Sequence, residues 1–204
     1  MSTHSNVESK SFSVQTIVKI SLLSAIAFVL MLFEVPLPFA PSFYKLGLDE
    51  VAVLIAAFSM GPLAGVLVEL FKIILNLIFH GTVTAFVGEL SNFLVGLSFI
   101  LPASIYYQGK KNRQRAFAGM GLGIIGIMIG GALCNYFLAL PAYEHFMHFP
   151  MDAIVGMGTA ILPLVHDKLT FVLFMTVPFN FVKGVVTSLI VALIYKRISP
   201  ILHR

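Results

Sequence analysis

The chain has 204 residues, of which 58% are hydrophobic and only 11% are charged. Because a soluble domain carries about a quarter charged residues, this composition excludes a soluble enzyme, a disordered protein and a secreted disulfide scaffold, and it favours an integral membrane protein. The net charge of +4 does not indicate a nucleic-acid partner, since most basic residues flank apolar stretches, and the single cysteine, Cys134, excludes an internal disulfide.

A membrane-spanning helix needs about 20 mostly apolar residues. One candidate stretch, Leu48–Met60, is short for a span. Gly61-Pro62 follows it directly and predicts a tight turn into the next helix, so we count it as a span. We therefore predict an all-α integral membrane protein with six transmembrane helices. Residues 1–14 form a tail before an uncleaved first span, and residues 15–204 form a single domain. The predicted spans are Gln15–Phe33, Leu48–Met60, Pro62–Phe79, Phe86–Tyr107, Ala116–Leu140 and Pro178–Tyr195.

The basic residues predict the topology. Most of the 13 lie in three segments: before or at the start of the first span, between the fourth and fifth spans, and after the last span. An even number of spans brings these three segments to one side. By the positive-inside rule that side is cytoplasmic, so both termini are predicted to be cytoplasmic. The residues concerned are Lys10, Lys19, Lys110, Lys111, Arg113, Arg115, Lys196, Arg197 and Arg204.

Two predicted external loops are unusually apolar. Glu34–Gly47 is rich in proline and aromatic residues, and Tyr143–Thr170 contains the apolar run Ala153–Val165. Loops of this kind fold over the helix bundle, over a ligand, or onto the lipid interface, where aromatic side chains anchor at headgroup level. The sequence leaves these alternatives open, as it does the conformation of Tyr143–Thr170.

Asn180 and Lys183 are the most informative polar residues inside a predicted span. An ionisable residue in a bilayer is costly and marks a functional site by default. If the last helix begins at Pro178, where the missing N–H of proline costs nothing, the two side chains share one face within the first two turns. An ammonium and an amide placed together in apolar surroundings suit the polar edge of a flat heterocycle. The alternative is a hydrogen-bonded pair that only joins helices.

Other polar residues in the spans have stronger structural explanations. Glu69 and Lys72 lie three apart and can neutralise each other as an intrahelical pair. Asp49, followed by Glu50, is placed where an acid meets the positive end of the helix dipole. For three further residues a ligand contact and helix joining are both open: Glu89, Asn92 and Asn135.

The sequence contains no motif that supports catalysis or resident metal binding. It has no phosphate-binding loop, so this chain alone performs no ATP-driven work, and it has none of the serine-hydrolase or zinc-protease motifs. His145 and His148 lie three apart in a loop without a third ligand nearby, which does not predict a metal site. The closely spaced glycines of the fifth span, from Gly119 to Gly131, instead predict close helix packing.

Four segments make the chain similar to a known family, the substrate-binding S components of energy-coupling factor (ECF) vitamin transporters. The resemblance covers nearly the whole chain, is most specific in the last segment, and is strongest to S components for riboflavin. The segments are Ser21–Met31, Phe43–Lys72, Gly88–Gly96 and Pro178–Leu202.

This resemblance implies a division of labour in a bacterial plasma membrane. The S component captures its vitamin from outside, whereas a transmembrane coupling protein and two ATPase subunits supply the energy; no cofactor is implied. The first helix of the family meets the coupling protein through an Ala-x-x-x-Ala face. Here Ser21 and Ala25 hold those positions, with serine replacing the first alanine.

The resemblance also implies where the ligand binds. The family's first external loop closes over the ligand, and the outer halves of spans four to six complete the site. The positions so assigned are Phe43, Tyr44, Lys45, Leu46, Asp49, Glu89, Asn92, Asn135, Asn180 and Lys183. A dry pocket with amides, one lysine and aromatic walls suits riboflavin, which is flat and uncharged, but would equally suit other heterocycles.

Three other functions are alternatives. An S component for a different vitamin would carry the same features. A self-sufficient proton-coupled carrier would use Glu69, Lys72 and Glu89 as a proton relay. An intramembrane enzyme is favoured by no motif.

Overall fold

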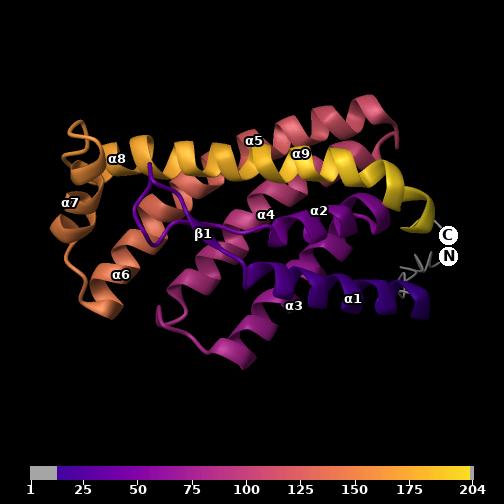
Figure 1. Cartoon of the computed structure of the whole chain (residues 1–204), viewed down its shortest axis with the longest axis horizontal. Coiled ribbons are helices and arrows are strands. Elements are labelled where there is room, and N and C mark those ends of the chain that lie inside the picture. Colours follow the sequence, from indigo (N-terminus) through magenta and orange to yellow (C-terminus); the bar gives the residue numbers. More distant parts are fainter. Residues whose placement is uncertain (1–12, 203–204) are drawn as a thin grey trace, which may run out of the picture.

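The computed structural model describes residues 13–202, and the side chains of residues 13–194. The molecule is an elongated helical bundle (Figure 1). One short antiparallel hairpin pairs Val35 with Leu46 and Pro36 with Lys45. The elements in chain order are α1 (Val14–Met31), β1 (Val35–Pro36), β2 (Lys45–Leu46), α2 (Asp49–Met60), α3 (Pro62–His80), α4 (Val87–Gln108), α5 (Arg113–Cys134), the π-helical turn η1 (Asn135–Ala139), α6 (Leu140–Met147), α7 (Met151–Ile161), α8 (Lys168–Phe171), the π-helical turn η2 (Val172–Thr176) and α9 (Val177–Leu202).

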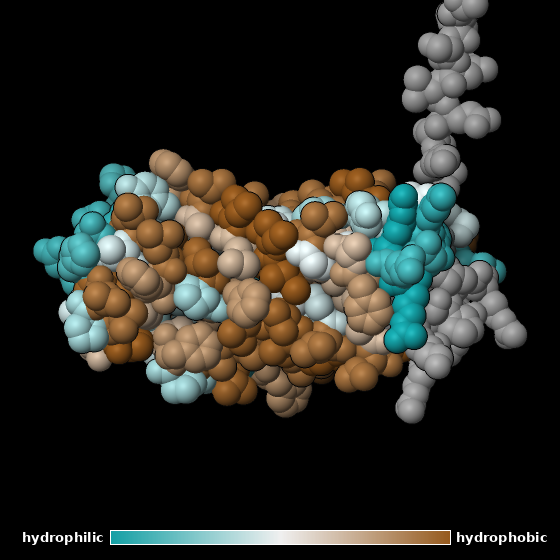
Figure 2. Space-filling model, turned by 90° about the horizontal axis from the view of Figure 1, so that it is seen from above, coloured by the Kyte–Doolittle hydropathy of each residue, from teal (hydrophilic) through white to brown (hydrophobic). Residues whose placement is uncertain are grey.

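The all-α membrane fold is confirmed. Five helical stretches among the described residues are long and apolar enough to cross a membrane. Apolar residues dominate the middle of the surface shown in Figure 2, whereas hydrophilic residues gather at its two ends. The five stretches are Val14–Met31, Pro62–His80, Val87–Gln108, Arg113–Met147 and Lys168–Ile194.

The remaining predicted span, α2, is the centre of the bundle. It has 12 residues and is therefore about 18 Å long, which is less than the hydrocarbon core of a bilayer. Every residue from Asp49 to Ser59 is buried. The helix packs against α1, α3, α4 and α9, so its neighbours and not lipid surround it. This explains why a short helix without a polar face is stable here.

The last helix does not begin at Pro178, and this prediction was wrong. Helical structure runs without a break from Lys168 to Leu202, and Pro178 lies inside it. A proline within a helix clashes with the carbonyl four residues earlier. Here the π-helical turn η2 ends two residues before Pro178, and η1 ends two residues before Pro141. Each wider turn coincides with the carbonyl that the proline ring would meet, which allows the helix to continue.

The predicted external loop Tyr143–Thr170 is largely helical. Its first residues complete α6, its middle forms α7, and its last residues begin α8. Three apolar side chains, Ile154, Val155 and Val165, pack onto Phe171 and Met175 in a separate small core. The apolar run in this segment therefore covers the end of the bundle.

The glycines of α5 bring that helix against α4, as predicted. A Cβ atom at Gly119 would lie 2.6 Å from the carbonyl oxygen of Ala103, and one at Gly123 would lie 2.8 Å from that of Phe99. Larger side chains would force the two backbones apart, so these positions set the spacing between α4 and α5.

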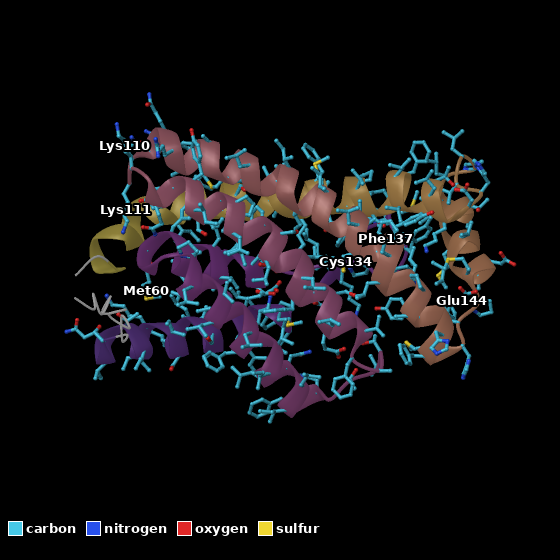
Figure 3. The ribbon with its side chains drawn as sticks, turned by 180° about the vertical axis from the view of Figure 1, so that it is seen from behind. Met60, Lys110, Lys111, Cys134, Phe137 and Glu144 are labelled. Atoms are coloured by element: carbon cyan, nitrogen blue, oxygen red, sulfur yellow. The ribbon has the colours of Figure 1, made fainter. Side chains whose placement is uncertain are left out.

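The ends of the molecule differ in charge. α1 begins and α9 ends at the same end of the bundle (Figure 1). Lys110 and Lys111, in the loop between α4 and α5, lie at that end as well, and Glu144 lies at the opposite one (Figure 3). Four of the residues used to predict the topology lie outside the described residues or have side chains that do: Lys10, Lys196, Arg197 and Arg204. The predicted tail 1–14 likewise falls almost entirely outside them.

Candidate functional site

A cavity of about 370 Å³ lies among α1, the hairpin, α3, α4, η1, α6 and α9. Its wall takes residues from the last turns of α1 and α3 and the first turns of α4, so it sits in the half of the bundle opposite to the α4–α5 loop. The predicted ligand-binding residues that line it are Phe43, Tyr44, Lys45, Glu89, Asn92, Asn135, Asn180 and Lys183.

Two predicted site residues lie away from the cavity wall. Leu46 is in β2, where it pairs with Val35 of β1. Asp49 faces the interior of the bundle and accepts a hydrogen bond of 2.6 Å from Lys72 Nζ. The acids at the start of α2 therefore do more than favour the helix dipole, because Asp49 is the closest counter-charge of a buried lysine.

Asn180 and Lys183 lie side by side on the wall formed by α9. The Nδ2 atom of Asn180 donates to the carbonyl of Thr176 at 3.0 Å. The amide also fills the space beside Gly131, where a Cβ would collide with it. The Lys183 side chain is 10% exposed, and its Nζ is 3.6 Å from Glu50 Oε1. Both polar groups are thus fixed by the bundle and still reach the cavity.

Behind this wall lies a buried cluster of charges, which we call the charge cluster. It comprises Asp49 and Glu50 of α2, Glu69 and Lys72 of α3, and Lys183 of α9. Lys72 Nζ lies 2.6 Å from Asp49 Oδ2, 2.7 Å from Glu69 Oε2 and 3.4 Å from Glu50 Oε1. The predicted intrahelical pair Glu69–Lys72 is therefore confirmed, within a larger network. Buried charges of this kind are stable only when paired.

Tyr44 joins the first loop to both π-helical turns. Its hydroxyl donates to Asn135 Oδ1 at 2.8 Å and lies 2.7 Å from Thr176 Oγ1. Its ring stacks on Phe179, with centroids 4.9 Å apart. Burial raises the pKa of the Tyr44 phenol, so the hydroxyl remains protonated at physiological pH. Asn135 is held from the other side, because its Nδ2 donates to the carbonyl of Gly131 at 2.9 Å.

Two acidic side chains, Glu34 and Glu89, line the cavity. Thr84 donates to Glu89 Oε2 at 2.7 Å, close to the start of α4. Glu34 lines the cavity from the first loop. Partial burial is the main cause that raises the pKa of the Glu34 carboxyl, and repulsion from Asp49 raises this pKa further. Carboxyl oxygens accept hydrogen bonds, whereas Asn180 and Lys183 can donate them, so the cavity offers both kinds of partner to a polar ligand.

Several residues at the site were not identified from the sequence. Glu34, Asn76 and Tyr143 line the cavity, and Thr176 holds Tyr44. The available signal was that Asn76 is a polar side chain inside a predicted span, whereas Glu34, Tyr143 and Thr176 carry no comparable signal. Of the phenylalanines, Phe43 and Phe179 line the cavity, as an aromatic sandwich would require.

The arrangement is suited to binding and not to bond breaking. Amides, a lysine and carboxyls face a space bounded by the aromatic rings of Phe43, Tyr44 and Phe179. Among the described residues no group of three or more His, Cys, Asp and Glu side chains could hold a metal ion. On the outside of α1, Ser21 and Ala25 are both exposed. The opposite face of that helix, which includes Ser24 and Ala27, packs into the bundle.

A helical membrane protein whose cavity is lined by polar and aromatic side chains, some of them from the first loop, belongs to the class of membrane-embedded binding proteins. Residues 15–195 match the family described as "ECF transporter, substrate-specific component". The chain belongs to this family, and it is a multi-pass membrane protein that forms the substrate-binding part of a transporter and not an enzyme. Family membership implies partner subunits of the ECF transporter and a transported substrate.

The chain is similar to several bacterial proteins over almost its whole length. It is 34% identical to the riboflavin transporter FmnP of Bacillus subtilis, over 92% of this chain and 93% of that one. It is also 34% identical to the riboflavin transporter RibU of Staphylococcus aureus, over 92% of both chains. A solved structure of the S component of a bacterial ECF transporter superposes with a TM-score of 0.72 at 34% identity, covering 93% of this chain and 98% of the other.

Proposed function

We propose that this S component captures riboflavin from the external side and delivers it for ATP-driven uptake by its partner subunits. Two relatives with which it shares 34% identity are riboflavin transporters. The observation that carries the proposal is the cavity wall on α9, where Asn180 and Lys183 face the same space as the rings of Tyr44 and Phe179. A flat, uncharged heterocycle with acceptors along one edge is complementary to this wall.

The size of the cavity supports a ligand of this kind. Its volume of about 370 Å³ lies within the range of about 300–1,000 Å³ that is usual for small-molecule sites. The aromatic rings can stack on the planar part of the ligand. Glu34, Glu89 and Asn92 can accept or donate hydrogen bonds to a hydroxylated side chain. We therefore assign riboflavin binding to the eight predicted residues that line the cavity, and not to Leu46 or Asp49.

The orientation and the partner surface are part of the same proposal. The positive end of the bundle, marked by Lys110 and Lys111, would be cytoplasmic, and both termini would lie there. The cavity would then open toward the external half. The exposed small residues Ser21 and Ala25 would meet the transmembrane coupling protein, which in turn contacts the two ATPase subunits.

A fluorescence titration tests the ligand and the site together. Riboflavin fluorescence should be quenched by the purified protein in detergent, with saturation at one flavin per chain. Asn180→Ala and Lys183→Ala each remove a group that hydrogen-bonds the ligand. We expect each loss to weaken binding by about tenfold to a hundredfold, the equivalent of about 1.5–3 kcal/mol. The matched control is Phe181→Ala on the same helix, because Phe181 is 48% exposed.

The outcomes separate the alternatives. If both α9 variants bind as tightly as the control, the assigned site is wrong. If wild-type protein quenches no riboflavin but binds another vitamin, the chain is an S component for that vitamin. Uptake by this chain alone in proteoliposomes, driven by a pH gradient, would favour the self-sufficient carrier.

A further inference from the structure

Lys183 is the member of the charge cluster that also lines the cavity. Its Nζ is 3.6 Å from Glu50 Oε1. An ammonium fully committed to a carboxylate would lie about 2.7–2.9 Å from it. The lysine is therefore held beside Glu50 by charge attraction, while its N–H donors remain available to an acceptor inside the cavity.

Glu50 is shared between the two lysines of the cluster. Its Oε1 atom lies 3.4 Å from Lys72 Nζ and 3.6 Å from Lys183 Nζ. The side chain is fully enclosed, and its Oε2 has no hydrogen-bond partner among the described residues. Because Lys72 also has close contacts to Asp49 and Glu69, it does not depend on Glu50. Lys183 does: Glu50 is the carboxyl with which it forms an ion pair in the described part of the chain.

The charges explain why Lys183 can stand in an apolar wall. A buried ammonium without a counter-charge is expensive and tends to lose its proton or turn toward solvent. The cluster holds three carboxyls and two lysines. Glu50 thus supplies the negative charge that keeps the Lys183 ammonium in place, at the depth where a ligand edge would meet it.

Resting on the proposed function, we propose that Glu50 is a positioning residue for vitamin binding. It does not line the cavity, but it neutralises the Lys183 ammonium and aims it at the ligand. Glu69 belongs to the same cluster, is equally buried and contacts Lys72, but it makes no ion pair with Lys183. Glu69 therefore serves as the matched control for removing one buried carboxylate from the cluster.

The test is a set of riboflavin affinities measured with purified full-length protein by flavin fluorescence. Glu50→Gln keeps the shape of the side chain and removes its charge, so we expect affinity to fall by about tenfold or more. Glu69→Gln should change affinity by less than about threefold. In a Lys183→Met background, Glu50→Gln should have no further effect beyond about twofold, since coupled residues are not additive.

A purely structural role for Glu50 would rank the riboflavin affinities of Glu50→Gln and Glu50→Asp differently. If packing alone mattered, the isosteric Glu50→Gln would bind normally and the shorter Glu50→Asp would bind poorly. If charge matters, Glu50→Asp binds more tightly than Glu50→Gln. If Glu50→Gln cannot be purified, Glu50→Asp is measured with and without Lys183→Met. The proposal requires Glu50→Asp to weaken binding only when Lys183 is present, whereas a packing role predicts the same loss in both backgrounds.

Failure of this inference is distinguishable from failure of the proposed function. Wild-type protein that binds no riboflavin refutes the function. Wild-type binding that is weakened by Lys183→Met but unchanged by Glu50→Gln refutes the positioning role alone, as would full additivity of the two changes.

Discussion

Tyr44 should control how long the ligand stays bound. Its hydroxyl ties the first loop to Asn135 in η1 and to Thr176 in η2, through contacts of 2.8 and 2.7 Å. Tyr44→Phe removes both contacts and keeps the ring stacked on Phe179 at 4.9 Å. The loop would then dock more weakly over the cavity, and a bound ligand would escape more often.

The size of the effect follows from the two hydrogen bonds. Each is worth about 0.5–1.5 kcal/mol net, and the buried partners Asn135 and Thr176 would lose theirs. A loss of about 1–2 kcal/mol corresponds to about a 5–30-fold faster dissociation if it falls on the docked state. The assay is stopped-flow displacement of bound riboflavin, followed by the recovery of flavin fluorescence.

A control variant and the pH dependence of the dissociation rate both test the role of the Tyr44 hydroxyl. Tyr136→Phe is the matched control, because the Tyr136 ring lies 4.3 Å from Lys168 Nζ and does not line the cavity. Burial raises the pKa of the Tyr44 phenol. The neutral donor is therefore present below the ordinary tyrosine pKa and persists above it, so the wild-type rate should not rise through that range on account of Tyr44. An unchanged dissociation rate in Tyr44→Phe would show that the contacts do not hold the loop.

Three further predictions concern packing, partner binding and buried charge. Gly123→Ala should lower the unfolding temperature, because a Cβ there meets the α4 backbone at 2.8 Å. Gly121→Ala, which has open space around it, should not lower the unfolding temperature. Equal effects would show that α4 and α5 can separate freely. Ala25→Phe should abolish co-purification with the coupling protein and leave riboflavin binding intact, whereas Leu189→Phe on the exposed face of α9 should leave both unchanged. Retained co-purification by Ala25→Phe would move the interface elsewhere. Lys72→Met leaves buried carboxyls without their closest cation and should cost about 3–5 kcal/mol, seen as a large fall in unfolding temperature in detergent; a small change would mean that the cluster does not depend on ionised carboxyls.

Much of the fold could be predicted because it follows from local apolar runs. Membrane spans need long apolar stretches, so the predicted ends of α1, α3 and α4 lie within two residues of the observed ends. The fifth span, predicted to end at Leu140, continues as helix to Met147. The start of the last helix was misplaced because Pro178 is a strong helix-start signal. The π-helical turn that accommodates this proline has no reliable sequence signature.

The site, like the fold, was only partly predictable from the sequence. Asn180 and Lys183 were recognisable because polar groups are rare in a span, and the resemblance to a family placed the first loop beside them. The partners of these residues were not predictable. Glu50 meets Lys183 only because α2 packs against α9, more than a hundred residues later in the chain, and Thr176 meets Tyr44 only because η2 turns it inward.

If Lys183 and Asn180 are buried because a captured flavin meets them, the purified protein should retain riboflavin. The most direct measurement is the absorbance spectrum of the protein as it is first purified, repeated after addition of riboflavin and removal of the excess. We expect visible flavin bands that correspond to up to one flavin per chain, and much weaker bands for Lys183→Ala. Colourless protein that retains no flavin after such loading would contradict it.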